Sequence, residues 1–465
     1  MSVDRLAALS PEQKQALLRD HLRRRAADGA GKRAPDFTRQ SYDMFMPGAD
    51  PGLGEIRRFN AWVESSIAAG RYTFETPRRE AQRPENVLVR EDGERLPVIN
   101  VASYNYLGLS YHPEVIAAAK AALDRYGLGV SSSPIAGGTI LLHAELEQAL
   151  VDFLGLPGRG ASLFTTGYNV NTGTLSAIIK PGGHVVLDAA AHMSLVEGAQ
   201  LTRGEVHTFA HNDLGDLERI LRGITRDGPK RILVCAEGVY SSDGDYGDLA
   251  GIVSVARRHG AMVLVDEAHS VLATGPGGRG VAARQGVLGE IDFFVVTFSK
   301  ALGALGGAVI CRRDIARYIN WYARCRLFSC GLDPAVTGGV LQALRLGAAD
   351  LGEARRARLR ANAARLRDRL GGRVRLIESD SWIVPVIYGS DERTLLLTDH
   401  MQRAGLETSI VQYPAVPRHL SRMRLFVTSE HTPEQIDRAA AIIVEAARTF
   451  GFAGPDGTSG EGGSL

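Results

Sequence analysis

The stretch AMVLVDEAHSVLATGPGGRGVAARQGVLGEIDFFVVTFSKALGALGG, residues 261–307, decides the fold. It holds two short apolar runs, AMVLVD (261–266) and FFVVTF (293–298), and each run is followed at once by polar residues. Short apolar runs that end in turn residues are typical of strands buried on both faces of a sheet. The stretch therefore predicts two strands of a buried sheet, with charged side chains placed where the strands end.

The same pattern extends in both directions along the chain. Four more apolar runs are SLFTT (162–166), HVVLD (184–188), RILVCAE (231–237) and AVICR (308–312). The runs alternate with helical stretches of 10–15 residues, such as HAELEQALVDFL and LGDLERILRGI. Buried strands that alternate with helices indicate an α/β fold: a mainly parallel central sheet with helices on both faces.

The sequence on either side of this region predicts smaller units. Residues 86–100 read as a hairpin, residues 1–30 as an amphipathic helix, and residues 353–370 as a long helix. Two further strand-and-helix pairs follow, which predicts a smaller α+β C-terminal domain. We therefore expect four parts: an N-terminal helix, arm and hairpin (1–97), a large domain (98–350), a small domain (351–453) and a disordered Gly/Ser-rich tail (454–465).

Composition excludes several classes of protein. Lys and Arg number 54 against 52 Asp and Glu, so no basic field favours nucleic acid as a partner. The four cysteines form no CxxC pair and no metal-ligand spacing, so we expect buried thiols in a reducing cytoplasm and no metal site. No apolar signal segment and no apolar stretch of about 18 residues is present, so we expect no membrane span.

Polar residues that follow the predicted strands define a candidate site. In open parallel sheets, ligands bind beyond the carboxyl ends of the strands, where residues distant in sequence converge. The chemically capable residues at these ends are Gly167, Tyr168, His192, Ser241, Asp266, His269, Thr297 and Lys300. Taken singly, Asp266 also reads as a capping carboxylate, and His192 and His269 as ordinary polar residues of the sheet edge.

Lys300 stands apart from the other lysines. The chain has six lysines against 48 arginines, and only Lys300 lies at the end of a buried strand and before a glycine-rich turn. An amine in a desolvated site loses its proton more easily and can form a Schiff base. Asp266 would balance a protonated ring nitrogen, and the helix that opens at Gly167 and Tyr168 would suit a phosphate. This combination suits pyridoxal phosphate.

The chain from about residue 98 to 450 resembles the α-oxoamine synthases, which are pyridoxal-phosphate enzymes of fold type I. Within that family, the chain most resembles serine palmitoyltransferase and 8-amino-7-oxononanoate synthase. Matching motifs include SYNYLGLSYHPEV (103–115), TTGYNVN (165–171), HMSLVEGA (192–199), FAHND (209–213), EGVYSSDG (237–244), VDEAHS (265–270), TFSKALGALGG (297–307) and RMRLFVTSEHT (422–432).

The resemblance implies a role for each cofactor-binding residue. Lys300 would hold pyridoxal phosphate covalently, Asp266 would pair with its ring nitrogen, and His192 would stack on the ring. His269 and Ser241 would lie near its phenolic oxygen. Its phosphate would be held by Gly167, Tyr168 and Thr297.

The resemblance also implies the substrates. Arg424 would bind the carboxylate of the amino acid, and Tyr104 would contact the amino acid or the acyl thioester. Tyr104 stands where glycine-using members carry asparagine, which disfavours 5-aminolevulinate synthase and 2-amino-3-ketobutyrate ligase. The sequences of segments 131–139 and 328–334 differ from those of these family members, so the resemblance does not identify the substrate.

The implied reaction is a decarboxylative condensation of an α-amino acid with an acyl thioester, giving an α-aminoketone, CO2 and a free thiol. The donor would be acyl-coenzyme A or an acyl-carrier protein, and the family implies a homodimer. Residues 1–30 would either dock a carrier protein or pack on their own dimer. Two alternatives remain: another reaction on the same fold, transamination or aldol cleavage, and a non-catalytic subunit.

Overall fold

The computed structural model describes residues 53–69, 72–90, 93–389, 391–413, 415–417, 419–452 and 454. The helix expected within residues 1–30, most of the arm and almost all of the C-terminal tail lie outside these residues. No helix in the described part of the chain is long and apolar enough to cross a membrane. The division into four parts at the boundaries given above stays a prediction.

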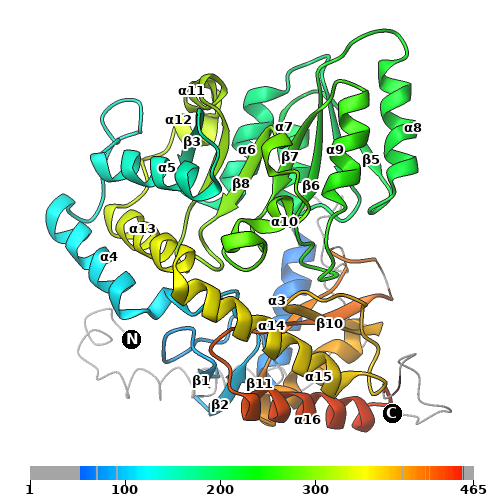
Figure 1. The fold of residues 1–465 in the computed structure, drawn as a ribbon. Coiled ribbons are helices and arrows are strands. Elements are labelled where there is room, and N and C mark those ends of the chain that lie inside the picture. The colour runs from blue at the N-terminus through cyan, green and yellow to red at the C-terminus, as the bar shows by residue number, and fades with distance from the viewer. Residues whose placement is uncertain are drawn as a thin grey trace.

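A seven-stranded sheet forms the centre of the larger part of the molecule (Figure 1). Its strands lie in the order β3-β9-β8-β7-β6-β4-β5. Their bounds are β3 Arg159–Phe164, β4 His184–Asp188, β5 Glu205–Phe209, β6 Ile232–Glu237, β7 Met262–Asp266, β8 Phe293–Thr297 and β9 Gly307–Arg312. Five neighbouring strands, β8, β7, β6, β4 and β5, are mutually parallel. The prediction of a mainly parallel α/β sheet is confirmed.

Strand β9 is antiparallel to both of its neighbours, β3 and β8. Only nine residues, 298–306, connect β8 to β9. A parallel connection needs a crossover of a dozen or more residues. A connection of this length therefore makes β9 antiparallel to β8. Lys300 lies in this connection and is held close to the carboxyl end of β8.

Helices cover both faces of the sheet, as the sequence predicts. Alternate residues along each strand point to opposite faces, so each strand feeds two cores. One core joins Val234 and Val265 to α8 and α9, and the other joins Cys235 and Leu264 to α6 and α7. The helices of this part are α4 Pro113–Tyr126, α5 Leu141–Leu154, α6 Gly167–Ile178, α7 Met193–Leu201, α8 Leu214–Thr225, α9 Leu249–Arg258, α10 Gly280–Arg284, α11 Arg313–Tyr322, α12 Arg324–Leu327 and α13 Pro334–Ala348.

The C-terminal part is α+β, again as expected. The antiparallel sheet β10-β13-β12 consists of β10 Ile383–Gly389, β12 Ser409–Val411 and β13 Ser421–Phe426. Its helices are α14 Asp350–Leu370, α15 Asp391–Arg403 and α16 Pro433–Thr449. A capping box forms at the start of α16, where the side chains of Thr432 and Gln435 bond to each other's backbone N–H groups.

The predicted hairpin forms from β1 (Glu85–Val89) and β2 (Arg95–Asn100). It does not stand alone, because β2 also pairs in parallel with β11 (Leu406–Glu407) from the C-terminal part. The helical spacing of FNAWVESSIAAGRYTF (59–74) predicts a helix there, and the observed helix α3 (Gly54–Ala68) begins and ends earlier. Residues 72–76, which follow it, are not helical.

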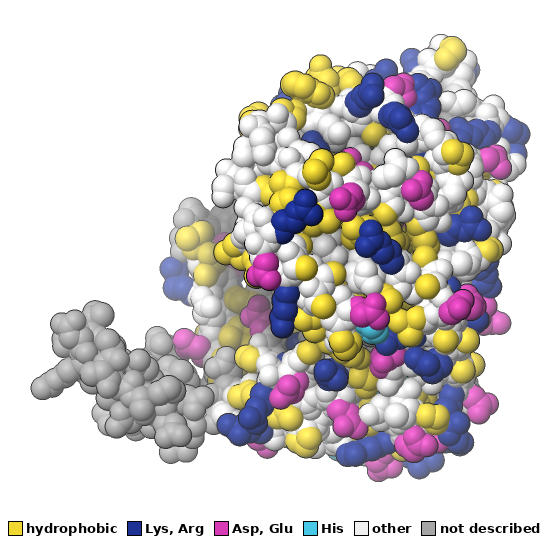
Figure 2. Space-filling model, turned by 60° about the vertical axis from the view of Figure 1, so that its left-hand side comes forward, with side chains coloured by type: hydrophobic (Ala, Val, Ile, Leu, Met, Phe, Trp, Pro, Cys, Tyr) yellow, Lys and Arg dark blue, Asp and Glu magenta, His cyan; other side chains and the backbone are white. Residues whose placement is uncertain are grey.

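On the face in Figure 2, basic and acidic side chains are interspersed and hydrophobic side chains lie exposed among them. This distribution agrees with a formal net charge of only +2.

Candidate active site

The carboxyl ends of the parallel strands bring the predicted residues together. Asp266 ends β7, Thr297 ends β8, and Lys300 follows three residues later. His192 precedes α7 after β4 ends at Asp188. Glu237 ends β6 and lies in register with Asp266 on the neighbouring strand. The edge of the sheet therefore carries a lysine, several carboxylates and an imidazole, as the order of the motifs predicts.

Asp266 is a buried carboxylate whose partners are neutral. Asn171 Nδ2 donates to one oxygen at 2.6 Å, and the backbone N–H of Ala268 donates to the other at 2.9 Å. Among the described residues, no cationic side chain comes within 4.0 Å of it. A buried charge normally needs a cationic partner, so this carboxylate is suited to a protonated ring nitrogen of a bound ligand.

Lys300 is half-buried and lies with its Nζ 5.8 Å from the ring centroid of Tyr104. Burial lowers the pKa of its amine, Asp266 and Glu237 oppose the shift, and Arg424 adds to it. No described carboxylate comes within 4.0 Å of the amine. Lys300 therefore has a larger fraction of free amine than an exposed lysine at the same pH.

The amino end of α6 offers a cradle for an anion. The Thr166 side chain caps the N–H of Asn169 at 3.1 Å, while the N–H groups of Gly167 and Tyr168 have no partner among the described residues. A Cβ at position 167 would lie 2.3 Å from Thr297 Oγ1, so only glycine fits against that hydroxyl. Two open N–H groups, a hydroxyl and the positive end of a helix fit a phosphate.

The side chain of Tyr168 points elsewhere. Its hydroxyl donates to Glu197, and its ring meets the His192 ring edge-on, with centroids 6.2 Å apart. The contribution of Tyr168 to the cradle is therefore its backbone N–H.

The site as a whole fits the expected pyridoxal phosphate. It offers a cradle for the phosphate, a carboxylate for the ring nitrogen and an amine for the aldehyde.

His192 is oriented by one hydrogen bond at its backbone N–H and another at its imidazole ring. Its N–H donates to the buried Glu237 carboxylate at 2.5 Å, and its Nδ1 contacts Ser194 Oγ at 2.8 Å. Asn171 links Ser194 (2.9 Å) to Asp266, so one polar chain connects His192 to the carboxylate. Burial lowers the pKa of His192, which favours the neutral imidazole. A neutral ring fixed in this way is suited to stack on an aromatic ligand.

His269 is buried and bonded to Tyr106, whose hydroxyl lies 2.6 Å from its Nδ1. Burial, together with the charges of Lys300 and Arg424, lowers the pKa of His269 well below its usual value. Burial raises the pKa of Tyr106 well above 10, so the phenol keeps its proton and can donate it to Nδ1. That arrangement leaves the proton of the neutral imidazole on Nε2, as a hydrogen-bond donor.

Arg424, on β13, reaches the same site from the C-terminal part. It donates to three neutral hydroxyls: Ser241 at 3.3 Å, Ser409 at 3.2 Å and Tyr104 at 3.4 Å. Its Nε is buried without a hydrogen-bond partner, and no described carboxylate pairs with it. A guanidinium held by hydroxyls alone is suited to a carboxylate that arrives with a substrate.

A pocket of about 370 Å³ opens beside Lys300. Tyr104, Arg78 and Leu305 are among its lining residues. Arg78 comes from the segment before the hairpin and is paired with Glu407. The pocket is large enough for a small substrate next to the amine.

Three buried groups of the site escaped the sequence analysis: Asn171, Glu237 and Tyr106. Asn171 belongs to the TTGYNVN motif and Glu237 ends an apolar run, so both lay within stretches that had been singled out. Burial, with the nearby charge of Asp266, raises the pKa of Glu237 well above its usual value. Their partners are 95, 45 and 163 residues away in the chain, and only the packed fold shows the pairing.

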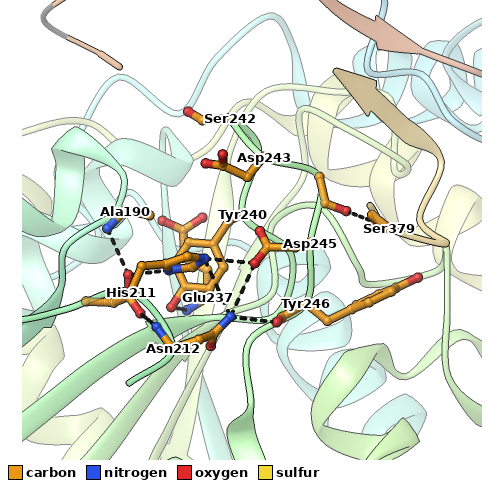
Figure 3. A network of polar contacts seen from close by, with 12 residues as sticks. Ala190, His211, Asn212, Glu237, Tyr240, Ser242, Asp243, Asp245, Tyr246 and Ser379 are labelled. Carbon is orange, nitrogen blue, oxygen red and sulfur yellow. Dashed lines mark hydrogen bonds and ion pairs between the residues drawn. The ribbon is translucent and has the colours of Figure 1, made fainter. Parts of the chain in front are cut away.

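A second polar network supports the loop that carries Ser241 (Figure 3). His211 bridges two carboxylates, with Nδ1 2.7 Å from Asp188 and Nε2 2.8 Å from Asp245. Asn212 joins Asp245 to the backbone carbonyl of Tyr246. Burial alone would lower the pKa of His211, but the hydrogen bonds to the two carboxylates outweigh it and raise the pKa to about 10.

Replacing His211 with glutamine should make stability depend less on pH. The folded-state pKa exceeds the unfolded value of about 6.5, so the bridge contributes fully below pH 6.5 and is lost as pH rises through about 10. We expect His211→Gln to cost on the order of 3 kcal/mol of unfolding free energy at pH 6 and much less at pH 10. Urea unfolding at pH 6, 8 and 10 measures this, and a cost that is equal at all three pH values would contradict it.

Comparison with known proteins agrees with this geometry. The family model "Aminotransferase class I and II" matches residues 97–443. A serine palmitoyltransferase from Sphingomonas paucimobilis is 38% identical over 77% of this chain and 84% of its own. An 8-amino-7-oxononanoate synthase from Salmonella paratyphi C is 36% identical over 74% of this chain and 88% of its own.

A solved structure shows the same fold. It is a serine palmitoyltransferase variant from S. paucimobilis with bound PLP-myriocin aldimine, and it superposes with a TM-score of 0.80 at 34% identity. The superposition covers 86% of this chain and 99% of that chain. Sequence and fold thus point to the same group of proteins.

Proposed function

The chain belongs to the α-oxoamine synthase family of pyridoxal-phosphate enzymes, and from that premise we propose that Lys300, Asp266 and Arg424 carry its reaction. The enzyme is an acyltransferase that condenses an amino acid with an acyl thioester. The observation that carries the residue assignment is a set of three buried or half-buried charges without ionic partners. Each lacks the group that cofactor or substrate would supply: an aldehyde, a ring nitrogen and a carboxylate.

When bound, pyridoxal phosphate draws the electron pair of the substrate Cα–H bond into its ring. Gly167, Tyr168 and Thr297 would hold the phosphate, and Asp266 would hold the proton on the ring nitrogen. The Lys300 amine, with its lowered pKa, accepts the proton from Cα. These roles need no movement of the sheet, because the strand ends already hold the side chains at one edge.

His192 and His269 complete the site. His192, whose backbone N–H is held by Glu237, would stack on the cofactor ring. His269 donates its Nε2–H to oxygen: to the phenolic oxygen of the cofactor or to the thioester carbonyl as negative charge develops there. A donor aimed at developing charge is typically worth about 3 kcal/mol in a site closed to water. Ser241 contributes a hydroxyl and fixes Arg424.

Arg424 should determine affinity for the amino acid. Replacement by lysine keeps the charge and loses the planar fork, which weakens two charge-assisted hydrogen bonds to the substrate carboxylate. We expect KM for the amino acid to rise about 10- to 100-fold, while KM for the thioester changes little. Steady-state kinetics with each substrate varied in turn measure this. Arg345→Lys, at an exposed position on α13, is the matched control.

The reaction assignment is tested by CO2 release from carboxyl-labelled amino acids. Relatives of this chain are serine palmitoyltransferases, so L-serine is tried first, then L-alanine and glycine. Release of CO2 that requires added acyl thioester, with one aminoketone formed per CO2, supports decarboxylative condensation. Release without thioester, or transfer of the amino group to a keto acid, would contradict it and favour the other reactions of this fold.

The acyl group can be carried by coenzyme A or by a carrier protein. We propose coenzyme A for the first trial, because a 2-amino-3-ketobutyrate coenzyme A ligase from Escherichia coli is 32% identical to this chain. The same CO2 assay with the acyl group on a carrier protein distinguishes the second form. Docking of a carrier by residues 1–30 stays a prediction, since these residues lie outside the described part of the chain. If residues 1–30 dock the carrier, deleting them should lower turnover with the carrier-bound donor and leave turnover with the coenzyme A donor unchanged.

We also propose a homodimer. Helix α11 and the residues after it expose large apolar side chains, with Trp321 63% and Phe328 81% accessible. Leu305, also exposed, lines the pocket beside Lys300, so a second copy that covers this region would close the site. Sedimentation equilibrium at micromolar concentration should give twice the chain mass of 50.0 kDa, and a single-chain mass would overturn the dimer.

A further inference from the structure

A second cluster of metal-ligand side chains lies at the opposite end of the sheet from the active site. His184 is the first residue of β4, and Glu205 is the first residue of β5. The two residues are direct partners in the parallel pairing of these strands, and His207 is two residues further along β5. Because residues two apart on a strand share a face, all three side chains project from the same face of the sheet.

The three ligand atoms form a compact triangle. His184 Nδ1 lies 3.2 Å from His207 Nε2 and 3.6 Å from Glu205 Oε2, and the last two atoms are 4.0 Å apart. Ligands of a tetrahedral zinc ion are about 3.4 Å apart, close to these separations.

We propose that His184, Glu205 and His207 bind a Zn²⁺ ion, with water in the fourth position. Two imidazoles and one carboxylate are borderline ligands that suit zinc and disfavour Mg²⁺ and Ca²⁺, which take oxygen. His184 is buried and Glu205 is exposed, so the site has one rigid ligand inside and one open side toward solvent.

The position of the site indicates a structural role. β5 is the last strand of the sheet and pairs with β4 alone among the described strands. Its first three residues are largely exposed, so few buried contacts hold its start in register. An ion shared by His184 on β4 and two residues on β5 joins the strands at that point. The spacing of the cysteines predicts no metal site, and the ligands proposed here come instead from two neighbouring strands.

The test uses untagged holoenzyme that has been dialysed against a chelator and then against metal-free buffer. Zinc chloride is titrated in competition with a chromogenic chelator, for the wild type and for His207→Ala and Glu205→Gln, both at accessible side chains. We expect one high-affinity zinc ion per chain in the wild type and at least about a tenfold loss of affinity in each variant. An excess of Mg²⁺ should displace none of it. His419→Asn, at an exposed residue with positive φ that asparagine tolerates, is the control and should bind as the wild type does.

A crystal soaked in zinc locates the ion independently of affinity. An anomalous difference peak about 2.0–2.2 Å from the three ligand atoms supports the proposal. Equal zinc affinity in the wild type and both variants would overturn it, and so would a peak elsewhere on the chain. In that case the two histidines form only a hydrogen-bonded pair. Cofactor absorbance recorded on each variant verifies that it is folded, and condensation activity is expected to stay unchanged because the active site lies at the other end of β4.

Discussion

Replacing Lys300 with alanine is expected to lower turnover by about 10³-fold or more. In the proposed mechanism the side chain holds the cofactor covalently and moves the Cα proton, and alanine removes both functions. The absorbance band near the visible edge that marks covalent attachment should disappear with it. Among the described residues no second lysine lies at the strand ends that form the site, so no neighbouring amine replaces it.

The matched control is Lys120→Ala, which removes an exposed amine from α4. This variant should keep both the band and the turnover of the wild type. A Lys300→Ala enzyme that retains the band, or that turns over within about threefold of the wild type, would contradict the assignment. Added cofactor should not restore turnover, since what the variant lacks is the amine.

Asp266→Asn should have the second largest effect, a fall in kcat of about 10²- to 10³-fold. Asparagine is nearly the same size, so the fold is retained, but a neutral amide cannot hold the proton on the cofactor ring nitrogen. The amide would also meet Asn171, which now donates to Asp266 Oδ2 at 2.6 Å. The ring then withdraws electrons less strongly, and removal of the Cα proton slows.

The exchange of solvent deuterium into the amino acid Cα measures that step directly. It should slow in Asp266→Asn in proportion to kcat. Asp248→Asn is the control, because Asp248 caps α9 through its side chain and asparagine caps equally well. If exchange in Asp266→Asn proceeded at the wild-type rate, Asp266 would have a structural role only.

The sequence predicted much of the fold because the buried strands are short, apolar and regularly spaced. It predicted Lys300 by elimination, since arginine replaces lysine almost everywhere else in the chain. Strand β5 escaped prediction, because its sequence EVHTF is largely exposed and forms no apolar run. The antiparallel direction of β9 follows from the length of its connection, which becomes meaningful once the strand ends are known.

The supporting groups of the site were harder to predict. Asn171 orients Asp266, Glu237 holds the backbone of His192, and Tyr106 sets the protonation of His269. Each belongs to a different element from its partner, so the pairing depends on how helices pack on the sheet. The contacts of His211, and those among the proposed zinc ligands, likewise join residues that come together only in the folded chain.

The most direct test of the account is to reduce the holoenzyme with borohydride and map its peptides by mass spectrometry. We expect one pyridoxyl-phosphate mass increment per chain, on the peptide that contains Lys300. The increment on any of the other five lysines, or its absence from a protein saturated with cofactor, would contradict the account.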